Sequence, residues 1–149
     1  MKHGKRLLII FYRNPELGKV KTRLAATVGE EKALAIYLMM ASHTKTIAEQ
    51  VTTDRVIYYT DFIDWEDNWP NEKFGKHLQH GSDLGERMSF AFANGFSAGF
   101  ERICIVGTDC FELTAEIIAQ AFHELAQTVL VLHFLFLNKW GNKLVMPSR

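Results

Sequence analysis

The chain has 149 residues, of which 48% are hydrophobic and 23% are charged, and this length and composition favour one globular domain, residues 1–149. Seventeen Lys and Arg balance seventeen Asp and Glu, so the formal charge is zero. A general nucleic-acid polymer partner is therefore disfavoured, because such binders carry a net basic field. Two cysteines exclude a disulfide scaffold, and the longest apolar stretch, residues 129–137, is too short to span a membrane. We expect a cytoplasmic protein without a membrane span.

The first half of the chain alternates between strand and helix patterns. Residues 7–12 form a continuous apolar run, which is typical of a strand buried on both faces. A turn-rich basic segment follows at 13–23, and the spacing of apolar residues predicts a helix over 29–50. A second strand is predicted at 54–60, a surface loop at 61–73 and a short third strand at 76–80.

The second half continues the alternation. Asp83, followed three residues later by Glu86, resembles a capping box that opens a helix reaching residue 96. Residues 102–106 read as a short buried strand, and Thr114 is a plausible N-cap for a third helix. A last strand is predicted at 129–137 and irregular structure at 138–149. Strands that alternate with helices indicate an α/β fold with a mostly parallel sheet.

The loop after the first strand concentrates positive charge. Residues 13–23 hold four cationic side chains and one carboxylate, a local charge of +3 in a neutral chain. Lys19, Lys21 and Arg23 are suited to binding the oxygens of a di- or triphosphate. From the residue types alone, an exposed basic loop that binds no ligand is an equally good interpretation. The segment is not a P-loop, because Arg13 stands where the first glycine belongs and Val20 where Ser or Thr belongs.

Asp109 directly follows the strand predicted at 102–106. A carboxylate at this place can bind Mg²⁺ or Mn²⁺ that bridges to substrate phosphates, since hard cations prefer oxygen ligands. Taken alone, an aspartate that caps a turn is the better interpretation. A basic loop and a carboxylate at the same edge of the sheet shift the balance toward metal–phosphate chemistry.

A third candidate is the glycine-flanked start of the second long helix. Free N–H groups there could hold a phosphate or the edge of a base, although a simply well-capped helix is slightly favoured. An oxidoreductase with a dinucleotide fingerprint is disfavoured, because no G-x-G-x-x-G follows the first strand. The candidate nucleotide-binding residues are Gln79, Gly81, Asp83, Leu84 and Gly85.

Three ordered sequence blocks resemble a known family. Residues 8–24 read L-I-I-F-Y-R-N-P-E-L-G-K-V-K-T-R-L, and further blocks lie at 79–88 and 107–114. Over about residues 5–127 they are similar to a glycosyltransferase-like bacterial family of unknown function (the DUF2064 type). That family belongs to the nucleotide-diphospho-sugar transferase superfamily, which has the GT-A fold.

The resemblance implies a Rossmann-like, three-layer GT-A domain that binds a nucleoside di- or triphosphate or a nucleotide sugar. By similarity, Lys21 and Arg23 would contact phosphates with Lys19 as a weaker helper, residues 79–85 would border the base, and Asp109 would bind Mg²⁺ or Mn²⁺. The implied activity is metal-dependent nucleotidyl or glycosyl transfer. No catalytic nucleophile is implied.

The chain also departs from the family pattern. Arg13 stands where a lysine is usual, and Phe111 replaces a proline. Residues 128–149 do not match the D-G-G-Y-Y-like segment that follows in the family, which suggests a truncated or altered C-terminus. The alternative function is therefore a catalytically inactive remnant that binds ligands or self-associates through its apolar tail, because uncovered strand edges and apolar patches promote association.

Overall fold

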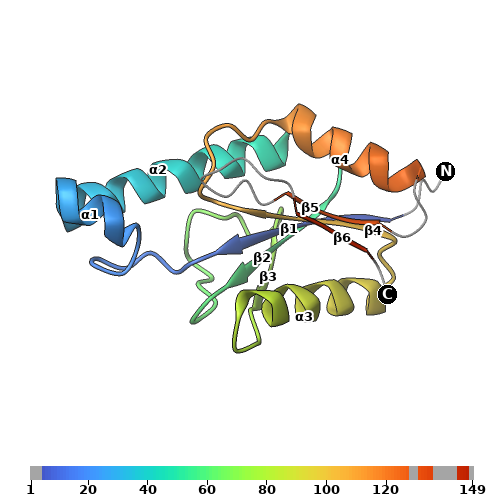
Figure 1. The fold of residues 1–149 in the computed structure, drawn as a ribbon, viewed down its shortest axis with the longest axis horizontal. Helices are drawn as coiled ribbons and strands as arrows, with labels where there is room; N and C mark the ends of the chain where they lie inside the picture. Colours follow the sequence, from blue (N-terminus) through green and yellow to red (C-terminus); the bar gives the residue numbers. More distant parts are fainter. Residues whose placement is uncertain (1–4, 128–130, 136–143, 148–149) are drawn as a thin grey trace.

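A computed structural model describes residues 5–127, 131–135 and 144–147 of the chain. In these residues a six-stranded sheet has the order β3-β2-β1-β4-β5-β6 (Figure 1). The strands are β1 (Arg6–Tyr12), β2 (Asp54–Tyr59), β3 (Gly75–Leu78), β4 (Arg102–Gly107), β5 (Val131–Leu135) and β6 (Leu144–Pro147). The helices are α1 (Thr22–Val28), α2 (Glu30–Glu49), α3 (Leu84–Ser97) and α4 (Ala115–Gln127).

The sheet is mostly parallel, as predicted. β1 lies at its centre and pairs in parallel with β2 on one side and β4 on the other. β3 extends the sheet in parallel beyond β2, and β5 does so beyond β4. Only the β5–β6 pair among the described strands is antiparallel. The continuous apolar sequence of β1 is explained by its position, because every residue from Leu7 to Tyr12 is buried.

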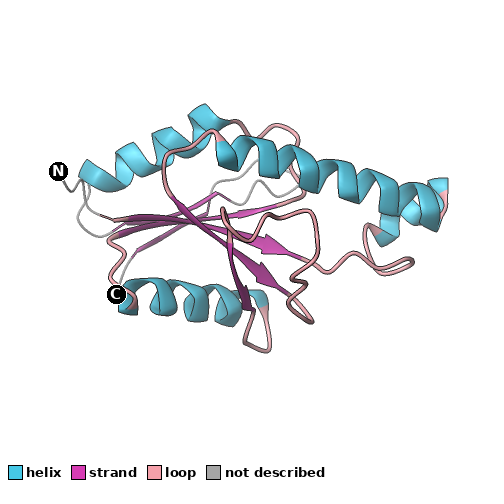
Figure 2. Cartoon of the chain, turned by 180° about the vertical axis from the view of Figure 1, so that it is seen from behind, coloured by secondary structure: helices cyan, strands magenta, loops and turns pink. Residues whose placement is uncertain are grey.

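Helices cover both faces of the sheet, which gives the predicted three layers. α2 and α4 lie on one face and α3 lies on the other (Figures 1 and 2). Alternate residues of β1 serve the two cores: Leu8, Ile10 and Tyr12 pack on the side of α2 and α4. The intervening β1 residues pack against α3. The same helix lies close to β4 at Gly95, since a Cβ added there would lie 2.5 Å from Ile103 Cδ1.

Two local predictions were wrong, and one helix was not predicted. The short helix α1 begins at the end of the turn-rich segment 13–23 and continues through residues for which no element was expected; it buries no side chain and so has no apolar stripe. The segment 61–73 is not simply a surface loop, since Trp69 is buried in the core beside Tyr12. Part of the segment expected to be irregular, Leu144–Pro147, pairs with β5, which shows that a four-residue apolar run can extend a sheet edge. The self-association predicted for 128–149 concerns side chains that lie outside the described residues.

The strand order creates a switch point between β1 and β4. From β1 the chain moves to β2 and β3 on one side, and it then returns to the other side to form β4 and β5. The loops that leave β1 and β4 therefore diverge at the carboxyl edge of the sheet, and such a crevice is where open α/β sheets bind ligands. Within the described part of the chain, no helix has the length and apolar character needed to cross a membrane.

Candidate functional site

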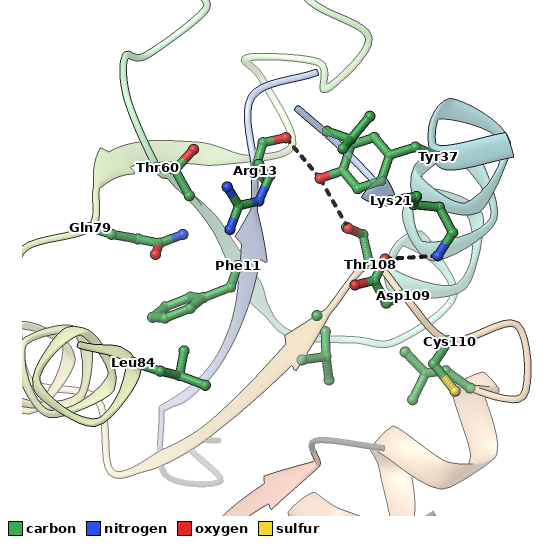
Figure 3. A pocket seen from close by; sticks show the side chains of 14 residues that line it. Phe11, Arg13, Lys21, Tyr37, Thr60, Gln79, Leu84, Thr108, Asp109 and Cys110 are labelled. Atoms are coloured by element: carbon green, nitrogen blue, oxygen red, sulfur yellow. Dashed lines mark hydrogen bonds and ion pairs between the residues drawn. The ribbon is translucent and has the colours of Figure 1, made fainter. Parts of the chain in front are cut away.

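A cavity of about 240 Å³ lies at this switch point. Arg13, Val20 and Lys21 line it from the loop after β1, and residues 106–110 line it from the end of β4 (Figure 3). Gln79 and Leu84, which flank the start of α3, contribute to a third side. The cavity thus collects side chains from the same three segments that the sequence singled out.

Lys21 and Asp109 face each other in this cavity. The Nζ atom of Lys21 lies 3.6 Å from Oδ1 of Asp109, and their side chains are 23% and 68% exposed (Figure 3). The structure therefore brings together the predicted phosphate-binding lysine and the predicted metal-binding aspartate. Because the aspartate is mostly exposed, solvent and dissolved ions have access to its carboxylate.

The backbone of Lys21 has an unusual conformation. Its φ of 47° and ψ of 50° place it in the left-handed region, and no other non-glycine residue of the described chain has a positive φ. Such a conformation is strained for a residue with a side chain and persists where the surrounding structure requires it. Here it ends the basic loop, starts α1 and directs the lysine side chain into the cavity.

Tyr37 of α2 connects the loops after β1 and β4. Its hydroxyl donates a hydrogen bond of 2.7 Å to the carbonyl of Arg13 and accepts one of 3.4 Å from the Thr108 hydroxyl. Burial, with smaller contributions from the neighbouring Tyr12 and Asp109, raises the pKa of Tyr37. The phenol therefore stays neutral and acts as a clamp. Sequence reasoning missed this role, since Tyr37 belongs to the apolar stripe of its helix and gave no other signal.

Asn14 connects the loops after β1 and β2. Its side-chain oxygen accepts hydrogen bonds from the backbone N–H groups of Asp61 at 2.9 Å and Phe62 at 3.3 Å. Its side-chain amide donates to the Phe62 carbonyl at 3.0 Å, and the residue is only 3% exposed. Asn14 thereby fixes the path of the chain directly after Thr60, which lines the cavity.

Arg13 also lines the cavity, and the sequence indicated it only through the charge of its loop. Its guanidinium makes no hydrogen bond or ion pair with any residue that the structure describes. Figure 3 shows the group pointing into the cavity between Gln79 and Thr108. The cavity therefore contains one cation paired with a carboxylate and one cation that has no protein partner in the described chain.

Two other predicted phosphate-binding residues lie elsewhere. Lys19 forms an exposed ion pair with Glu16, with 3.1 Å between its nitrogen and the carboxylate oxygen, and does not line the cavity. Arg23 is an exposed residue of α1 that does not line the cavity either. The positive φ of Lys21 separates the three residues, because it turns the chain between Lys19 and Arg23.

The predicted nucleotide-binding segment reaches the cavity at only two of its residues. Gln79 and Leu84 line the cavity, whereas Gly81, Asp83 and Gly85 do not. Asp83 instead caps α3 by accepting a hydrogen bond of 2.8 Å from the N–H of Glu86. The Glu86 carboxylate in turn accepts from the N–H of Ser82, so the start of α3 is capped by its own side chains.

A glycine is required at position 81 by packing alone. A Cβ at Gly81 would lie 2.7 Å from both the Arg87 nitrogen and the Glu86 Cβ, and the φ of Gly81 is 145°. The residue allows the chain to fold closely against the first turn of α3. This local packing accounts for the glycine without a ligand.

The residues at Asp109 fit a divalent cation only together with a ligand. The described residues contain no group of three His, Cys, Asp or Glu side chains that could hold a metal by themselves. Mg²⁺ in phosphate-binding enzymes is held by one or two carboxylates, with the remaining ligands from water and substrate phosphates. One exposed carboxylate beside a phosphate-sized cavity meets this requirement, so Asp109 could share such a cation with bound phosphate.

Comparisons with known proteins agree with this architecture. No protein of curated function matches the chain. A crystal structure of a candidate nucleotide-diphospho-sugar transferase from Desulfovibrio desulfuricans G20 matches 82% of this chain with 28% sequence identity and a TM-score of 0.72. The chain spans 55% of the length of that protein. A family described as uncharacterised protein conserved in bacteria, DUF2064, matches residues 40–135, more than half of the sequence. The chain therefore belongs to the DUF2064 family and has the fold of a nucleotide-diphospho-sugar transferase.

Proposed function

We propose that the cavity binds the phosphates of a nucleotide or a nucleotide sugar, and that the protein takes part in nucleotidyl or glycosyl transfer. The observation that carries the proposal is the 3.6 Å approach of Lys21 to Asp109 at the switch point of the sheet. This edge is where related folds place phosphates. The similarity to the Desulfovibrio protein supports the same class of ligand.

In this proposal Asp109 would hold Mg²⁺ or Mn²⁺, and Lys21 would bind oxygens of the phosphates. The cation, when bound, neutralises the negative charge that develops on the phosphates during transfer. Lys21 adds a charge-assisted hydrogen bond and orients the ligand. The neutral hydroxyl of Tyr37 keeps the two loops at a fixed separation and does not itself react.

Thermal denaturation in the presence of ligands tests the proposal. A panel of nucleoside triphosphates, nucleoside diphosphates and nucleotide sugars is compared with and without Mn²⁺. A ligand that binds only the folded protein stabilises it by RT ln(1 + [L]/Kd), so at least one compound is expected to raise the melting temperature in a metal-dependent way.

Two matched variants make the result specific. Asp109→Asn is expected to lose the metal-dependent part of the shift, because it removes the charge and keeps the shape of the side chain. Asp54→Asn is the control, since Asp54 is an exposed carboxylate at the opposite, amino end of the sheet. A panel in which no nucleotide shifts the melting curve would contradict the proposal and favour the non-catalytic alternative.

A further inference from the structure

The charges that line the cavity do not cancel. Arg13, Lys21 and Asp109 are its charged lining residues, and Lys21 lies beside Asp109. The net positive charge of the lining is therefore carried by Arg13. An anion that enters the cavity without a metal meets a lysine that already has a carboxylate neighbour and an arginine that has none.

Hydrogen bonds from α2 and from the loop after β2 hold the backbone at Arg13 and Asn14. The carbonyl of Arg13 accepts the hydrogen bond from the Tyr37 hydroxyl, and the next residue, Asn14, is held by the loop after β2. The Arg13 side chain is exposed and points into the cavity (Figure 3). This combination presents a cation at a defined place and leaves its hydrogen-bond donors available.

We propose that Arg13 is the metal-independent anchor for the phosphates, whereas Lys21 binds phosphate only after a divalent cation has replaced it at Asp109. The guanidinium presents a planar fork of donors that can bind two phosphate oxygens at once, which suits it to a first contact made without metal. The ligand class is a diphosphate group, as in a nucleoside diphosphate or a nucleotide sugar. The inference rests on the proposed function and adds the order in which the two cations act.

The cation at Asp109 and the phosphates therefore bind cooperatively. A divalent ion placed on Asp109 without phosphate would lie next to the Lys21 ammonium and would be repelled by it. Phosphate held by Arg13 offers Lys21 a new partner and gives the ion further oxygen ligands. Metal binding alone is expected to be weak, and bound diphosphate strengthens it.

Calorimetric titration with methylenediphosphonate, a pyrophosphate analogue without a base, tests this division of roles. The titration is performed in EDTA and in Mg²⁺. Wild-type protein is expected to bind the probe in EDTA, and Arg13→Gln is expected to bind it about tenfold more weakly, since charge-assisted hydrogen bonds are lost. Lys32→Gln, which removes an exposed cation of α2 outside the cavity lining, is the matched control and should bind as the wild type does.

The double variant K21M/D109N removes the ion pair and keeps the net charge of the lining. It is expected to lose the gain in affinity that Mg²⁺ gives to the wild type, and to lose less metal-free affinity for the probe than Arg13→Gln loses. Unchanged binding by Arg13→Gln in EDTA would overturn the inference, as would absence of wild-type binding without metal. Equal losses in Arg13→Gln and K21M/D109N in EDTA would overturn it too.

These outcomes are separable from those of the proposed function. A nucleotide that stabilises the protein only with Mn²⁺, together with no probe binding in EDTA, would leave the proposed function in place and remove the role of Arg13. The Arg13→Gln protein should fold normally, because the hydrogen bond at this position uses the backbone carbonyl and not the guanidinium. Its melting temperature without ligand checks this point.

Discussion

Replacing Asn14 by alanine should destabilise the protein strongly for a single polar residue. The side chain makes three hydrogen bonds with backbone groups, two from N–H groups and one to a carbonyl, and accepts a longer one of 3.4 Å from the Thr60 hydroxyl; all the partners lie in the loop after β2. At about 0.5–1.5 kcal/mol for each hydrogen bond, the expected loss in the free energy of unfolding is about 2–4 kcal/mol. The residue is 3% exposed, so water cannot readily replace the lost partners.

Urea denaturation of N14A against N71A measures this effect. Asn71 lies in the same loop, is exposed and donates one hydrogen bond of 3.0 Å to the Trp65 carbonyl. Its replacement should cost less than about 1 kcal/mol, because an exposed partner is solvated after the change. Equal unfolding midpoints for the two variants would refute the reasoning, since burial and the number of hydrogen bonds would then make no difference.

Three further results are expected. Lys76→Met should reduce the free energy of unfolding by about 2–4 kcal/mol, measured by urea denaturation, because it removes a fully buried ammonium and leaves the partly buried Asp67 carboxylate without the cation that lies 2.8 Å away. Tyr37→Phe should reduce it by about 1–2 kcal/mol, since the carbonyl of Arg13 loses its donor. Burial raises the pKa of all four tyrosines, that of Tyr12 to about 12. Unfolded tyrosines lose protons near pH 10, so stability should fall as pH rises from about 10 toward 12, and phenolate absorbance should appear only as the protein unfolds.

The sequence predicted the elements whose burial leaves a periodic or continuous apolar pattern. Residues Leu7 to Tyr12 of β1 are buried and apolar, so the sequence predicted a strand buried on both faces, whereas its central place in the sheet comes from the structure. The carboxyl edge of a parallel sheet gathers the loops that follow its strands, which is why Lys21 and Asp109 could be expected on the same side. Their contact in the structure agrees with that argument.

Other features depend on contacts that no local pattern encodes. Tyr37 looks like any other apolar-face residue of a helix, and its role comes from two loops distant in sequence. Trp69 lies in an acidic segment that reads as a surface loop, although its ring packs against Tyr12 in the core. Arg13 could not be distinguished from Lys19 or Arg23 by charge, because only the folded loop shows which cation lines the cavity.

Under the proposed function, the charges also predict which end of a nucleotide would lie toward β1 and β4. Two carboxylates lie at the start of α3: Asp83 accepts a hydrogen bond from the N–H of Glu86, and Glu86 accepts one from the N–H of Ser82. A phosphate placed there would meet like charge, whereas the lining between β1 and β4 keeps a net positive charge. Leu84 presents an apolar side chain to the cavity on the α3 side. We therefore expect the phosphates to lie toward β1 and β4 and the uncharged end of the ligand to lie toward α3.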